Sequence, residues 1–167
     1  IANDINGSDS DSTLAEIASG AVITAGGTLA VEAEETLNLS QIAGGVAGGG
    51  VGVGGFVAVA DYAGSVTARI GDNSVIDNIT SLSLSATVNS GGDKTITLPD
   101  NTTIIVKPVN STVIGASVGL VGLNASIANV NLTENALAEI GDNVTISAGG
   151  DTGSVTVAST RDVDAEV

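Results

Sequence analysis

Apolar and polar residues alternate along much of this chain with the two-residue period of a β-strand. The alternation is clear at residues 28–33 (Thr-Leu-Ala-Val-Glu-Ala), at 56–62 (Phe-Val-Ala-Val-Ala-Asp-Tyr) and at 126–132 (Ser-Ile-Ala-Asn-Val-Asn-Leu). It places alternate side chains on opposite faces of each strand. No stretch has a convincing helical period, so the pattern predicts an all-β protein.

A six-residue motif recurs in this pattern. Ala-Arg-Ile-Gly-Asp-Asn at 68–73 returns as Ala-Glu-Ile-Gly-Asp-Asn at 138–143, and a looser copy lies at 15–20. The apolar residues that follow also recur, and Val22 reappears 53 positions later as Val75. Self-similarity in a fixed order is the mark of a repeat architecture. We expect Val, Ile and Leu ladders to point inward, and Ser, Thr and Asp to coat the outside.

The repeats suggest one domain with a short leader. We predict an acidic linker or loop at 1–13 and a single β-solenoid domain at 14–167, with units at about 15–67, 68–137 and 138–167. The chain begins with Ile rather than Met, so we expect a piece of a longer protein or a processed product.

An irregular stretch interrupts the second unit. Equivalent positions are 53 and then 70 residues apart, so this unit carries about 17 extra residues. They fall within 89–115, where a turn-like segment at 89–94 precedes two short apolar runs at 95–98 and 103–106. We predict a β-hairpin inserted at a corner, around 89–112. Such an insertion is where binding specificity would be placed.

The Ile-Gly-Asp-Asn part of the motif, at 70–73 and 140–143, is interpreted as a corner between strands rather than as a metal loop. Glycine would supply a positive φ there, and the Asp and Asn side chains would cap their own backbone.

A glycine-rich stretch at 44–55 has three interpretations. A phosphate cradle needs a following helix and a Lys or Ser/Thr at a set spacing, and neither is present. A membrane-active glycine segment would be odd before such a polar continuation. The third is a flat strand of little side-chain volume, packed close to another backbone. Val51-Gly52-Val53 matches Val121-Gly122-Leu123 at an offset of 70, which favours the strand.

Composition narrows the fold and the partners. Hydrophobic residues make up 43% of the chain but aromatic residues only 1%, so the core must be built from Val, Ile, Leu and Ala. Such residues fill space well in stacked β-ladders. The net charge of −15 argues against nucleic-acid binding and against docking on anionic lipids. No apolar run is a convincing membrane span.

Candidate chemistry is sparse. The chain contains no Cys, Met, Trp or His, which rules out a Ser-His-Asp triad and thiolate or imidazole metal sites, and we expect no enzymatic activity. Calcium is the one cofactor that stays a candidate. Asp4, Asn6, Asp9 and Asp11 are spaced like the start of an oxygen-ligand loop, although as a solvated acidic linker the segment needs no ion.

The repeated motifs resemble those of very large bacterial surface proteins. Ala-Arg/Glu-Ile-Gly-Asp-Asn, then Thr/Ser-Ala-Gly-Gly, then Val-Thr-Val-Ala, after a Gly/Val/Ala stretch, are similar to repeats of filamentous-haemagglutinin-like and leukotoxin-like adhesins, over about 15–165. These adhesins are exported by two-partner or autotransporter routes. The resemblance implies a right-handed parallel β-helix, an extracellular location at the cell surface and an adhesive or scaffolding role. It carries over no catalytic residues.

We therefore expect a non-catalytic structural or adhesive region of a bacterial surface adhesin. Its partners would be receptors on host or neighbouring cells, or other copies of itself, with no nucleic acid and no membrane insertion. The alternative is a self-assembling subunit of an extracellular filament or surface layer. In that case open coil ends, or a strand such as 44–60, would pair with the next copy.

Overall fold

The structure, a computed structural model, describes residues 2–6, 11–97, 101–150 and 153–167, with only the backbone described for 2–6 and 96. Strands dominate these residues, and no helix occurs among them. The strands are β1 (Ala2–Asn6), β2 (Asp11–Ile17), β3 (Val22–Thr24), β4 (Thr28–Leu37), β5 (Leu39–Gly48), β6 (Val51–Ile70), β7 (Val75–Ile79), β8 (Ser81–Ser90), β9 (Lys94–Thr97), β10 (Thr103–Val106), β11 (Val109–Val118), β12 (Val121–Ile140), β13 (Thr145–Ala148), β14 (Ser154–Asp162) and β15 (Ala165–Glu166).

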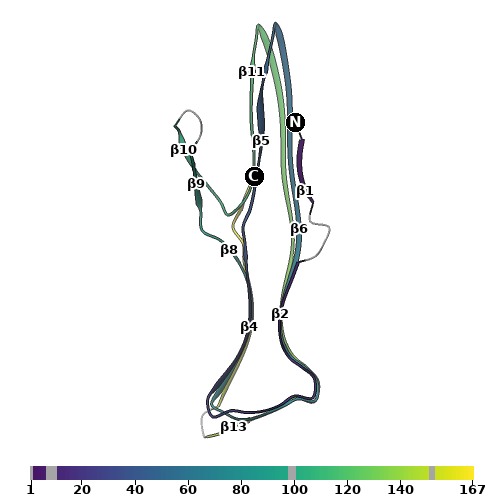
Figure 1. Cartoon of the computed structure of the whole chain (residues 1–167), viewed down its shortest axis with the longest axis vertical. Helices are drawn as coiled ribbons and strands as arrows, with labels where there is room; N and C mark the ends of the chain where they lie inside the picture. Colours follow the sequence, from purple (N-terminus) through teal and green to yellow (C-terminus); the bar gives the residue numbers. More distant parts are fainter. Residues whose placement is uncertain (1, 7–10, 98–100, 151–152) are drawn as a thin grey trace.

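Three successive passes of the chain lie on one another in four sheets of parallel strands (Figure 1). In the first sheet β6 is central, with β1 and β2 along one edge and β12 along the other. The other three have the orders β3-β7-β13, β4-β8-β14 and β5-β11-β15. All pairings in these four sheets are parallel, so the expected all-β class with stacked parallel strands is confirmed.

The registers confirm the spacings predicted from the repeats. Val22 pairs with Val75, 53 positions later, and β12 pairs with β6 at an offset of 70 along its whole length. Ile146 still pairs with Ile76 at an offset of 70, whereas Val155 pairs with Leu82 at 73. The third pass is therefore longer by a net three residues: the offset falls to 69 at Ala148 and then rises to 73 at Ser154.

The extra residues of the second pass form the predicted hairpin. Leu37 and Leu39 are two positions apart, but their partners Ser90 and Val109 are nineteen apart, which places 17 additional residues between β8 and β11. Within this insertion β9 and β10 pair antiparallel. The hairpin stands beside β5 and β11 (Figure 1).

The repeated motif forms a corner, as expected, but its glycines have a different role. The positive φ belongs to Asn73 (58°) and Asn143 (56°), and to Gly20 (74°) in the first pass. Gly71 is required instead by close stacking, because a Cβ there would lie 2.5 Å from the backbone nitrogen of Ser19. The interpretation that glycine supplies the positive φ is therefore wrong for the two full copies.

The hydrophobic core lies in the lower part of the stack in Figure 1, which we call the base and define as residues 14–37, 65–90, 136–150 and 153–160. Residues of the middle pass, including Val66, Ile76 and Leu84, are fully buried there because a pass covers them on each side. Burial of each such side chain contributes about 1.5–3 kcal/mol. In the base, the expected inward Val, Ile and Leu ladders are observed.

In the upper part of the stack, valine side chains point outward instead of inward. We call this part the arm and define it as residues 41–60 and 109–130; its strands form the long loops at the top of Figure 1. In the arm part of β6 four of the five buried positions are Gly or Ala and the fifth is Phe56, while Val51 and Val53 point outward and are exposed. The expectation that valine ladders point inward is therefore wrong for the start of β6. The inward positions of β6 in the arm are therefore occupied by Gly and Ala, with Phe56 (5% exposed) as the exception.

The glycine-rich stretch at 44–55 is two strands rather than one. It contains the end of β5, a turn, and the start of β6. The turn requires glycine, since Gly49 has a φ of 147°. The predicted close approach of backbones is found at Gly44, where a Cβ would overlap the carbonyl of Ile114.

The start of the chain also differs from the prediction. Residues 2–6 and 11–13 belong to β1 and β2, both paired with β6, rather than to a linker or loop. Parallel pairing uses backbone groups, and the edge of β6 offers these to polar and apolar segments alike.

Candidate functional site

The predicted calcium ligands lie along one edge of β6. Asp4 and Asn6 are in β1, opposite Val59 and Asp61, and Asp11 begins β2. Asp9 lies outside the described residues. In the described part of the chain, no group of three or more acidic side chains is placed to hold a metal ion. Calcium binding by this segment stays a prediction.

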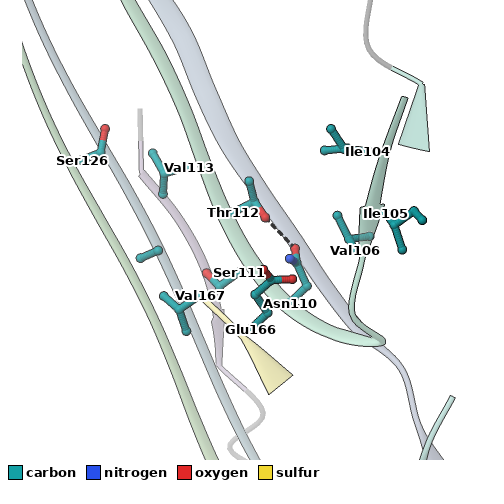
Figure 2. Close-up of a pocket in the computed structure, with 11 residues that line it drawn as sticks. Ile104, Ile105, Val106, Asn110, Ser111, Thr112, Val113, Ser126, Glu166 and Val167 are labelled. Carbon is teal, nitrogen blue, oxygen red and sulfur yellow. Dashed lines mark hydrogen bonds between the residues drawn. The ribbon is translucent and has the colours of Figure 1, made fainter. Parts of the chain in front are cut away.

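An open cavity of about 410 Å³ lies beside the inserted hairpin, between β10, the start of β11, β12 and the end of the chain (Figure 2). Its lining is formed by Ile104, Ile105, Val106, Asn110, Ser111, Thr112, Val113, Ser126, Ala128, Glu166 and Val167. The Thr112 hydroxyl donates to Asn110 Oδ1 at 2.9 Å, which orients the amide. Aliphatic walls with a few hydroxyl and amide groups and one carboxylate suit binding rather than acid–base chemistry.

An ionic contact fixes the hairpin beside this cavity. Lys107 Nζ lies 2.8 Å from Asp164 Oδ2 and 3.5 Å from Asp93 Oδ1. The hydrogen bond to Asp164 and the charges of both carboxylates raise the pKa of Lys107, which keeps it protonated. The insertion is therefore attached to the last pass, so it does not depend on its two connections alone.

A polar cluster lies inside the stack, between the base and the arm. The Tyr62 hydroxyl donates to Glu35 Oε1 at 2.5 Å, and the Thr13 hydroxyl donates to Glu35 Oε2 at 3.5 Å. Glu134, one pass further on, is 9% exposed, and among the described residues neither of its carboxylate oxygens has a hydrogen-bond partner. Gly64 leaves room for the cluster, since a Cβ there would lie 2.9 Å from the Tyr62 ring.

Burial is the main cause of pKa shifts at two residues of this cluster, Glu134 and Tyr62. Burial, followed by the charge of Glu35, raises the pKa of Glu134, while the charge of Arg161 opposes the shift. Burial and the hydrogen bond to Glu35 raise the pKa of Tyr62. Sequence reasoning missed the cluster, although Glu35 occupies an inward position of an otherwise apolar alternation in β4, and that was a readable signal.

The arm presents an exposed aliphatic face on β6 and β12. Its members are Val51, Val53, Val121, Leu123 and Ile127, each between 53% and 69% exposed. We call this set the arm face. In the described residues no helix is long and apolar enough to cross a lipid bilayer.

Comparisons of the chain with protein-family models, with curated proteins and with solved structures find no match.

Proposed function

We propose that the chain is a non-catalytic, structural and adhesive repeat region of a bacterial cell-surface protein, built as a right-handed parallel β-helix and located outside the cell. The observation that carries the proposal is the ladder register. Equivalent residues of successive passes pair over all twenty residues of β6 and β12. Such a stack satisfies backbone groups between neighbouring passes and gains length at about 4.8 Å per pass. A spacer at the cell surface has to extend over a long distance, and stacked passes do this with a simple, repetitive sequence.

The corner contacts support the β-helix. The Gly71 amide donates to the carbonyl of Ile17 at 2.7 Å, and the Gly141 amide donates to that of Ile70 at 2.8 Å. The same turn is thus joined to its copy in the adjacent pass. The Asn143 amide reaches Asn73 Oδ1 at 3.5 Å in the same ladder. Repetition of one corner keeps successive passes in line.

The inserted hairpin and its cavity are the proposed receptor contact. The base and the arm repeat from pass to pass, whereas the hairpin occurs once among the described residues and carries the mixed aliphatic and polar lining. A unique feature on a regular scaffold is suited to specific recognition. The partner would be a receptor on a host or neighbouring cell.

The strand registers define a deletion that tests whether the hairpin is the receptor contact. Deleting residues 91–107 removes 17 residues and joins Ser90 directly to Pro108 and Val109, as Leu37, Asn38 and Leu39 are joined in the first pass. Beads coated with the wild-type chain should attach to cultured epithelial cells or to bacterial cells, and beads coated with the deletion variant should attach far less. Far-UV circular dichroism and urea unfolding would verify that the variant keeps the stack. Equal attachment by a folded deletion variant would reject the hairpin as the contact, and attachment of neither protein to any cell would reject the adhesive role.

A further inference from the structure

The arm face cannot be explained by the packing of the chain itself. The inward positions of the arm part of β6 hold Phe56 and otherwise only Gly and Ala, so the aliphatic volume of Val51 and Val53 lies on the outward face. Additional passes on either end of the stack would cover strand edges. They would not cover this outward face, because stacked strands extend a sheet in its own plane.

Charge identifies which surface of one molecule another copy could approach. The chain carries 19 acidic and 4 basic residues, yet none of them falls in 41–60 or 109–130. Elsewhere two copies would bring carboxylates together, and like charges brought into apposition oppose association. Contact through the arm avoids this repulsion. The outer face of the base, by contrast, carries Glu16, Glu32 and Glu34.

Shape also favours a second copy. The arm face is a flat ladder of aliphatic residues, in which Val51 lies on Val121 and Val53 on Leu123. Flat faces of this kind pack on each other at about 10 Å. The opposite side of the arm has the hairpin next to it, whereas no described element stands over the outer face of β6 and β12 at this level (Figure 1).

We propose that the arm face is a self-association surface, which packs against the arm face of a second copy. This goes beyond the proposed function, because a stack could extend and bind a receptor without self-association. Two strands of about seven residues present roughly 230 Å² of flat area, well below the ~800 Å² per partner of a typical stable interface. The contact between two single chains is therefore weak, and it gains strength when several arms act together.

Matched variants test the proposal. The arm variant carries Val51→Thr, Val53→Thr and Leu123→Thr; Thr keeps the preference for strands and removes the apolar surface. The control carries the same exchanges, Leu14→Thr, Val22→Thr and Val75→Thr, at exposed positions of the base. Sedimentation equilibrium of the wild-type chain from about 20 μM to about 1 mM should show the average mass rising toward that of a dimer. The arm variant should raise the dissociation constant at least about tenfold, and the control less than about twofold.

Three results would overturn the inference. The first is a wild-type chain that stays monomeric up to about 1 mM, and the second is association, including growth into fibres, that the arm variant leaves unchanged. The third is binding of monomeric wild-type chain to phosphatidylcholine vesicles in a flotation assay, lost in the arm variant, which would make lipid the partner. If the wild-type chain and the control grow into fibres and the arm variant does not, the inference is supported. None of these measurements involves cells or the hairpin, so failure here is distinct from failure of the adhesion assay.

Discussion

The base and the arm are made by the same strands, yet they bury opposite kinds of residue. In β6, Val66 is fully buried in the base, whereas Val53, thirteen positions earlier on the same strand, is 69% exposed in the arm. The same face of β6 is inward along the whole strand, so the difference follows from which residues occupy that face. In the base the inward residues include valine and isoleucine; in the arm they are glycine and alanine with Phe56 as the exception, and Val51 and Val53 occupy the outward face. The same regular backbone pairing is thus compatible with inward valines in the base and outward valines in the arm.

The largest expected effect comes from one substitution made in both regions. Val66→Ala removes two methyl groups from the core and leaves a cavity, so it should lower the free energy of unfolding by about 2–3 kcal/mol. Val53→Ala removes the same atoms from an exposed site and should change it by less than ~0.5 kcal/mol. Urea unfolding at low micromolar concentration, where copies are separate, measures both. Equal losses would mean that the arm face is packed within the monomer.

A second effect of about 2 kcal/mol is expected inside the arm. Gly44→Ala would place a Cβ against the carbonyl of Ile114, 3.1 Å from its carbon atom, and force the two passes apart. Gly50→Ala is the control, since a Cβ there would meet no atom within 4 Å. Urea unfolding midpoints of the two variants should differ clearly. If both behave as wild type, β5 and β11 lie further apart at Gly44 than the structure indicates.

These contrasts show what sequence could and could not predict. Recurring residues predicted the offsets of 53 and 70, because residues of successive passes lie directly on one another. Alternation divides a strand into two faces but does not say which is inward, so the outward valines of the arm were assigned to the wrong side. At the corners, close stacking and positive φ both select glycine, and only the structure separates Gly71 from Asn73.

The sequence predicted where the candidate site lies but not which residues form it. The 17-residue excess located the insertion, but the cavity beside it also needs Glu166 and Val167 from the last pass, and no local pattern relates these to Ile104. The polar cluster between base and arm could have been noticed at Glu35. Its partner Tyr62 comes from the next pass, and Glu134 from the pass after that, so their meeting depends on the stacking.

The smallest expected effect concerns Glu134, which lies between the base and the arm. Burial raises the pKa of Glu134, and Glu35 and Asp11 add to the shift while Arg161 opposes it. Below the unfolded-state pKa the carboxyl is protonated in both states and carries no penalty. As pH rises through the raised folded-state pKa, the folded chain must hold a buried carboxylate whose oxygens lack partners among the described residues, and it loses stability.

Glu134→Gln removes that charge and nearly keeps the shape. Relative to wild type, it should therefore gain on the order of 1 kcal/mol between about pH 4 and pH 7, with little difference at the acidic end. Urea unfolding at several pH values measures the gain. Glu32→Gln, at an exposed position of β4, removes the same charge from the outer face and should show no comparable trend. A gain for Glu134→Gln that does not depend on pH would indicate that packing, rather than the buried charge, limits stability where the base meets the arm.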